Sequence, residues 1–318
     1  MFQESFKIIV SGVGQSFILG LIGYFLIKRN ILGEEGLYAL SRLVIEVTMP
    51  VFIFYRLIKD FSFHLYPDWW VFPLISVGIT IAGLLVGLIF SGFVKGLQHK
   101  LQFLSLVAFQ NSGYLPLVLV ASLLQGERLS TMFIYLFLFL LGFNLLLFSF
   151  GVYILTFHKD KKFEWQSLFS PPVIATFLGL AVVALNLSRF IPEVIIKPLG
   201  ITGDCTLPLA TFVVGGNIAA IHLRKVEKKL ISAMVMAKLV ILPALGLWLV
   251  WQFNLPSPLG LLIVLQSAMP PATNLSVILN HYKKEDLIVS QGIFFGHIAS
   301  LVTVPVFLSL YFMKFMLK

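Results

Sequence analysis

Two short segments combine prolines with amide side chains inside otherwise apolar runs. They read Gln110-Asn-Ser-Gly-Tyr-Leu-Pro116 and Gln266-Ser-Ala-Met-Pro-Pro-Ala-Thr-Asn274. Proline lacks the backbone N–H and its ring clashes with the preceding turn, so each segment is expected to break a helix. An asparagine amide offers donors and an acceptor, and the start of a half-helix carries partial positive charge. Asn111 and Asn274 therefore predict a site that holds a carboxylate without a buried cation.

The prolines and one glycine are expected to shape this site. Each segment contains proline, Pro116 in the first and Pro270 and Pro271 in the second. These matching prolines favour a true crossover of two broken helices, and Gly113 would let the two backbones approach closely. The alternative is that each proline only kinks its helix and each amide only caps the backbone that the proline frees. The two interpretations are compatible.

Four of the ionisable residues inside apolar runs are candidates for a function, because a charge there is costly and by default indicates function. Glu46 and Asp204 are candidates for carrying a coupling proton, although Arg42 stands one turn before Glu46 and could neutralise it. Lys238 could replace a coupling cation or attract an anion; alternatively it snorkels or pairs with an acid such as Asp204. His297 could titrate near neutral pH or be a satisfied interior histidine.

The composition defines the class of protein. Of 318 residues, 58% are hydrophobic and only 12% are charged, and the mean hydropathy is +0.97. A water-soluble protein of this size needs more charged surface, so the chain is interpreted as a polytopic membrane protein. The net charge of +9 then indicates basic cytoplasmic loops and not nucleic-acid binding.

A membrane span requires about 20 apolar residues. On this criterion we expect ten spans, at residues 7–27, 36–57, 69–94, 101–124, 130–157, 171–190, 194–222, 230–253, 258–281 and 287–313. The loops after spans one, three, five, seven and nine carry more lysine and arginine than the others, which places both termini outside and these loops in the cytoplasm.

The two halves of the chain repeat the same pattern. Glu46-Val-Thr-Met-Pro-Val-Phe-Ile-Phe54 aligns with Asp204-Cys-Thr-Leu-Pro-Leu-Ala-Thr-Phe212, and the two proline segments align in nearly the same register. Each copy has five spans, so the second must enter the membrane from the opposite face. The expected fold is an all-α polytopic membrane protein of two inverted five-helix repeats, residues 1–157 and 171–318, joined by a short basic loop, 158–170. Spans four and nine are its broken crossover helices.

The motifs Asn111-Ser-Gly-Tyr-Leu-Pro116 and Pro270-Pro-Ala-Thr-Asn274 resemble those of the auxin efflux carrier family, in its PIN-like and bacterial branch. The resemblance covers essentially the whole chain. It implies a scaffold of spans one, two, six and seven, a transport domain that moves like an elevator, and an organic anion bound at spans four and nine. Pro116 follows Leu115 directly, where many bacterial relatives have another glycine. Residues 158–170 stand where long-form plant carriers have a long loop.

The expected function is secondary transport of a small organic anion, auxin-like or dicarboxylate, across the plasma membrane. The expected partners are this anion, a coupling proton or sodium ion, and the lipid bilayer, with a homodimer left open; no cofactor, metal or nucleic acid is expected. A sodium-coupled symporter of a related inverted-repeat class is the main alternative. An enzyme is disfavoured because Gly200-Ile-Thr-Gly-Asp204 misses the membrane aspartyl protease spacing and no zinc-binding His-Glu-x-x-His occurs. A transporter-like sensor is disfavoured because the chain has no signalling domain.

Overall fold

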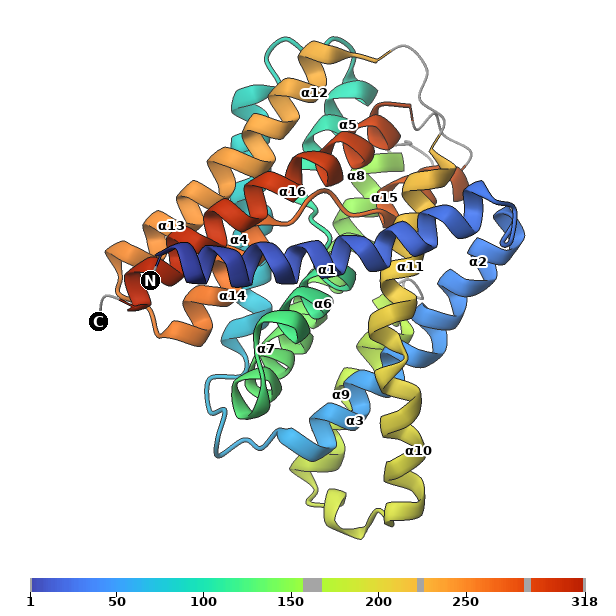
Figure 1. Ribbon diagram of the computed structural model, residues 1–318, viewed down its shortest axis with the longest axis vertical. Coiled ribbons are helices and arrows are strands. Elements are labelled where there is room, and N and C mark those ends of the chain that lie inside the picture. Colours follow the sequence, from blue (N-terminus) through green and yellow to red (C-terminus); the bar gives the residue numbers. More distant parts are fainter. Residues whose placement is uncertain (1, 157–167, 222–225, 283–286, 317–318) are drawn as a thin grey trace.

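The computed structural model describes residues 2–156, 168–221, 226–282 and 287–316, and these residues are almost entirely helical (Figure 1). The described part contains seven helices long and apolar enough to cross a membrane and three shorter apolar helices. The predicted class, an all-α integral membrane protein, is confirmed. The seven long helices are Ile9–Lys28, Glu34–Asp60, Val71–Phe90, Gly126–Leu155, Glu193–Ala220, Lys228–Gln252 and Leu287–Lys314; the shorter ones are Tyr114–Leu123, Pro171–Ala184 and Ser257–Ala268.

One group of helices packs around the contact between α1 and α11. Its members are α1 (Phe2–Lys28), α2 (Glu34–Leu43), α3 (Met49–Asp60), α9 (Pro171–Ala184), α10 (Glu193–Asp204) and α11 (Thr206–Ala220), with a short 3₁₀ turn at Ser188–Phe190. α3 packs against α9 and α10. A Cβ atom added at Gly215 would lie 1.7 Å from the Gly20 carbonyl oxygen, so glycine is required for this backbone approach. We call these helices the first group.

The second group contains the segments with the paired prolines. Its members are α4 (Val71–Phe90), α5 (Leu97–Ala108), α6 (Tyr114–Leu123), α7 (Gly126–Leu146), α8 (Val152–Thr156), α12 (Lys228–Val235), α13 (Leu242–Gln252), α14 (Ser257–Ala268), α15 (Asn274–His281) and α16 (Leu287–Met316). α4 packs on α5 and α7, and α14 packs on α13 and α16. The two groups meet where α1 contacts α6 and α16 and where α3 and α9 contact α7 (Figure 1).

Wide π-helical turns interrupt three of the long helices, at η1 (Val44–Thr48), η2 (Leu147–Gly151) and η5 (Met236–Ile241). Two of them precede a proline, Pro50 for η1 and Pro243 for η5. Proline has no N–H for the carbonyl one turn earlier, and a π turn is one way in which a helix absorbs this loss. Glu46 lies in η1 and Lys238 lies in η5, so two of the four ionisable candidates sit at these irregular turns.

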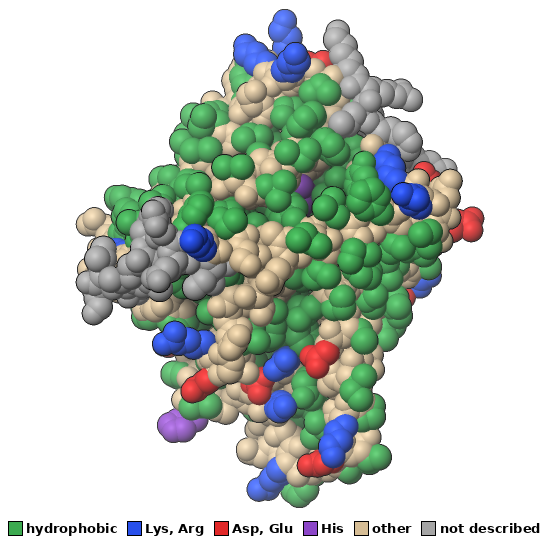
Figure 2. Space-filling view, viewed as in Figure 1, with side chains coloured by type: hydrophobic (Ala, Val, Ile, Leu, Met, Phe, Trp, Pro, Cys, Tyr) green, Lys and Arg blue, Asp and Glu red, His purple; other side chains and the backbone are tan. Residues whose placement is uncertain are grey.

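The predicted breaks are present in both proline segments. Segment 101–124 holds the helices α5 and α6, and segment 258–281 holds α14 and α15, each pair separated by non-helical residues. The number of membrane crossings and the inverted relation of the two halves stay predictions. Figure 2 shows apolar side chains over much of one face, with lysine and arginine at its upper end, at its right edge and, together with acidic side chains, across its lower part.

Candidate functional site

The two breaks lie against each other and join their backbones. Gln110 and Pro271 form an antiparallel bridge. The Asn111 N–H donates to the Pro270 carbonyl at 2.8 Å, and the Ala272 N–H donates to the Phe109 carbonyl at 3.0 Å. Irregular backbone at membrane depth is stable only where protein or water satisfies its polar groups. Here each break supplies partners for the other, and we call this contact the crossing.

The prolines act at different points of the two breaks. Met269 precedes Pro270 and is extended, with φ −67° and ψ 142°, because a residue before proline is pushed out of the helical region; α14 therefore ends at Ala268. Pro116 instead occupies the first turn of α6, where an N–H has no helical partner in any case. Pro116 thus starts a helix, and the break lies before it, at residues 109–113.

Gly113 is not where the two backbones meet. It is the N-cap of α6, and a Cβ atom added there would lie 3.6 Å from both Leu140 Cδ2 and Met49 Cε, an ordinary contact distance. The close approach expected at Gly113 occurs instead at Gln110 and Pro271. The reason is that antiparallel bonding needs extended residues, and Gly113 already has the helical conformation of an N-cap.

Asn111 and Asn274 both line a small cavity at the crossing, with a volume of about 60 Å³. Asn111 is buried, with 4% of its surface exposed, and its Oδ1 accepts a long bond of 3.5 Å from the Leu115 N–H. Its Nδ2 has no partner among the described residues, and neither has Nε2 of Gln110. The capping bond is therefore weak, and two buried amide donors remain available beside the start of α6.

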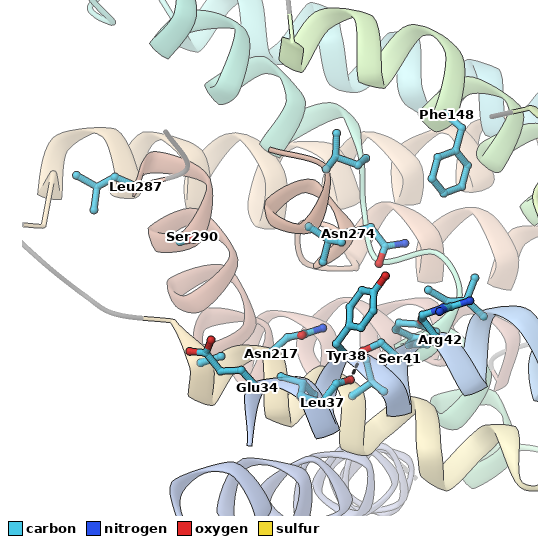
Figure 3. A pocket seen from close by; sticks show the side chains of 16 residues that line it. Glu34, Leu37, Tyr38, Ser41, Arg42, Phe148, Asn217, Asn274, Leu287 and Ser290 are labelled. Atoms are coloured by element: carbon cyan, nitrogen blue, oxygen red, sulfur yellow. Dashed lines mark hydrogen bonds between the residues drawn. The ribbon is translucent and has the colours of Figure 1, made fainter. Parts of the chain in front are cut away.

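A larger cavity of about 700 Å³ adjoins the small one, and we call it the vestibule. Asn274, Tyr114, Phe148 and Ile45 line both cavities. Figure 3 shows the Asn274 amide and the Tyr38 ring pointing toward each other across the vestibule. Its remaining lining residues are Glu34, Leu37, Ser41, Arg42, Val213, Asn217, Ala220, Val277, Ile278, Leu287 and Ser290. The vestibule thus lies between the two helix groups and combines aromatic, amide and charged side chains.

The two acidic candidates lie outside both cavities and each has an arginine partner. Glu46 receives two bonds from Arg42, Nε to Oε1 at 2.7 Å and Nη2 to Oε2 at 2.9 Å, which confirms the pairing that the one-turn spacing predicts. Asp204 Oδ1 lies 3.7 Å from Nη2 of Arg56, which also contacts Asp60. Lys238 does not pair with Asp204 in the described residues, because its ammonium contacts Gln110 while Arg56 of α3 lies beside that carboxylate.

Lys238 and His297 are buried in the second group. The Lys238 ammonium is 0% exposed and lies 3.5 Å from Oε1 of Gln110, so it contacts the crossing. His297 Nδ1 bonds to the Ile293 carbonyl at 2.8 Å, and its Nε2 has no partner among the described residues. Neither side chain lines either cavity. His297 follows Gly296, where an added Cβ would lie 2.6 Å from Pro271 Cδ, so α16 packs directly on the crossing.

Several residues of this site did not stand out as candidates in the sequence. Tyr38, Arg42 and Asn217 line the vestibule although they lie on first-group helices far from the proline segments. Gln110 and Gln266 occupy matching places in the two sequence segments, but Gln110 lies in its break and Gln266 lies in the last turn of α14, where its Nε2 donates to the Ser112 carbonyl at 3.1 Å. The recurrence of glutamine in both segments is a signal that could have identified this pair.

Comparison with known proteins bears on the whole chain. The sequence model of a family described as membrane transport protein matches residues 8–158 and 155–308. Among relatives, PIN-LIKES 6 and PIN-LIKES 1 of Arabidopsis thaliana are 29% and 26% identical, but the chain spans only 28% and 34% of their lengths. An uncharacterized transporter of Methanocaldococcus jannaschii is 26% identical, with 90% of this chain and 94% of the relative covered. The resemblance drawn from the two motifs is thereby confirmed.

Proposed function

We propose a function that starts from the family of the chain. The chain belongs to the auxin efflux carrier family of membrane transport proteins, so it is a transporter and not an enzyme. We infer that it is a secondary carrier of an organic anion. The observation that supports this most directly is the pair of buried amide donors at the crossing, Gln110 Nε2 and Asn111 Nδ2, which have no partner among the described residues.

These donors suit a carboxylate. A buried donor without an acceptor is costly, and a carboxylate oxygen accepts several hydrogen bonds at once. The half-helices α6 and α15 start at the crossing, and their N-termini favour negative charge. Asn274 is the first residue of α15 and faces both cavities. In our proposal Asn111 and Asn274 hold the carboxylate between the two broken helices, with Gly113, Pro116, Pro270 and Pro271 fixing the backbone around it.

The vestibule favours an amphipathic acid over a very small dicarboxylate. Its volume of about 700 Å³ lies within the usual range for drug-sized ligands. Tyr38, Tyr114 and Phe148 offer ring faces to an apolar body, and Arg42 adds a cation. An auxin-like aromatic acid would fit this lining, whereas malonate would leave most of it unused.

Alternating access would follow from movement of the second helix group against the first. We propose ten crossings in two inverted five-helix repeats, with the first group as scaffold and the second as the moving part, in an elevator-type mechanism. The vestibule lies near the start of α2 and the end of α11, which adjoin loops that we assign to the cytoplasm of a plasma-membrane protein with both termini outside. The described conformation would then be open to the inside.

The test is uptake of radiolabelled acids by proteoliposomes that contain the purified protein. Indole-3-acetate, malate and malonate are compared, with indole-3-acetamide as the uncharged competitor. We expect saturable uptake of one acid, little inhibition by the amide, and loss of uptake in Asn274→Ala. Gln98→Ala, at an exposed position of α5, is the matched control. Uptake that is equal in Asn274→Ala and the control would contradict the proposed site, and no uptake of any acid would contradict the proposed substrate class.

A further inference from the structure

The Lys238 amine lies at the crossing without a carboxylate beside it. Its side chain is 0% exposed, so its ammonium does not reach the membrane surface. In the described part of the chain no acidic oxygen lies within 4.0 Å of its Nζ. Its one hydrogen-bond partner there is Gln110 Oε1 at 3.5 Å. A charge buried in this way needs some other source of negative potential.

In our proposal the ends of two helices at the crossing supply that potential. α5 ends at Ala108 and α14 ends at Ala268, both next to the crossing, and η5 packs against both helices. The last four carbonyls of a helix lack helical partners, and together they carry about half a negative charge. At these two ends the Phe109 N–H donates to the Ser105 carbonyl and the Met269 N–H donates to the Gln266 carbonyl. Two such helix ends in a bilayer attract a cation.

Gln110 links Lys238 to the proposed substrate site. Its side chain accepts from the ammonium, its backbone bridges to Pro271, and the next residue is Asn111. The contact is long, but the charge of a protonated ammonium favours the amide orientation in which Oε1 faces Lys238 and Nε2 points elsewhere, where it has no partner among the described residues. Lys238 is thus placed to orient the donors of the crossing without touching the anion itself, which makes it a positioning residue.

In ion-coupled carriers of this architecture, half-helix C-terminal ends and unwound carbonyls coordinate the coupling cation. We propose that the Lys238 ammonium takes that role as a resident cation of the crossing, and that anion binding here needs no sodium. This inference rests on the proposed function and concerns its coupling. The proposal also gives the π-helical turn η5 a structural role. This turn carries Lys238, and it packs against α4, α5, α14 and α16.

The first test compares uptake of the transported acid in sodium chloride and in choline chloride at equal ionic strength. Wild-type uptake is expected to be the same in both salts. Lys238→Met should raise the KM by about tenfold or more, because the buried amide loses a charged partner. Lys229→Met, which removes an exposed lysine from α12, should behave as wild type. Wild-type uptake that requires sodium, or normal uptake by folded Lys238→Met, would overturn the inference.

The second test needs neither a known substrate nor a folded variant. Thermal unfolding of the purified wild-type protein is followed while sodium replaces choline. A ligand that binds only the native state raises the unfolding midpoint by mass action, so we expect a change below about 1 °C across the titration. A saturable rise with sodium would show a sodium site and refute the resident cation. This result stands even if no acid is transported, so failure of this inference and failure of the proposed function are distinguishable.

Discussion

Replacing Asn111 by alanine should weaken anion binding strongly and leave the protein folded. Its Nδ2 has no partner among the described residues, so a bound carboxylate would be its acceptor. A hydrogen bond to a charged group contributes about 1.5–3 kcal/mol. Since about 1.4 kcal/mol is a factor of ten, the dissociation constant should rise roughly ten- to a hundredfold.

The cost to folding should be much smaller. The other polar atom of Asn111, Oδ1, makes only a 3.5 Å bond to the Leu115 N–H, at the limit of hydrogen-bond geometry. Loss of that bond should lower the free energy of unfolding by no more than about 1 kcal/mol. Affinity and stability thus respond differently to this one substitution, and this difference separates a binding role from a capping role.

The assay is direct binding of the transported acid to purified protein, paired with thermal unfolding of the same samples. Asn111→Asp is the second arm: two carboxylates about 4 Å apart repel by about 4 kcal/mol at an effective dielectric constant of 20, so binding should be undetectable. Gln98→Ala is the control. The reasoning is refuted if Asn111→Ala binds the acid as wild type while its unfolding temperature falls, because the amide would then be a helix cap.

Two further predictions concern packing and the vestibule. Gly215→Ala should destabilise the protein by about 3 kcal/mol or more, seen as a lower unfolding temperature, because the added Cβ would lie 1.7 Å from the Gly20 carbonyl; Gly14→Ala, with nothing within 4 Å, should be tolerated. Arg42→Gln should raise the KM for the anion roughly tenfold by removing a cation from the vestibule, whereas Glu46→Gln should not raise it. Neither change should move the unfolding temperature, since the pair is exposed.

The sequence was sufficient to predict features that depend on local chemistry. Prolines in both segments predicted the two breaks, although they act differently: α14 ends just before Met269 and Pro270, whereas Pro116 starts α6 after the break. Pro198 and Pro305 lie inside continuous helices, so a proline alone does not determine a break. The Arg42–Glu46 pair followed from a spacing of one helical turn. Long apolar runs predicted the long helices within a few residues; segment 69–94, for example, corresponds to Val71–Phe90. In each case the deciding interaction spans at most a few neighbouring residues.

Features that depend on contacts between distant residues could not be predicted from the sequence. Lys238 contacts Gln110 across 128 positions, and Arg56 on α3 lies beside Asp204 at the end of α10. No periodicity carries this information, so Lys238 could be assigned a buried place but not a partner. Gly113 shows the same limit. Its type suggested close backbone approach, yet the strand-like bridge falls on Gln110 because that residue, and not the N-cap, is extended.

The crossing also explains why a polar site is stable at this place in an apolar protein. A single broken helix would leave backbone groups without partners in the bilayer, which is costly. Two breaks in antiparallel contact satisfy one another through the Asn111 N–H and the Ala272 N–H. Backbone pairing uses no side-chain amides, so Gln110 Nε2 and Asn111 Nδ2 stay buried and without partners among the described residues. The arrangement that stabilises the broken helices therefore leaves buried amide donors at their junction, where we propose that the anion binds.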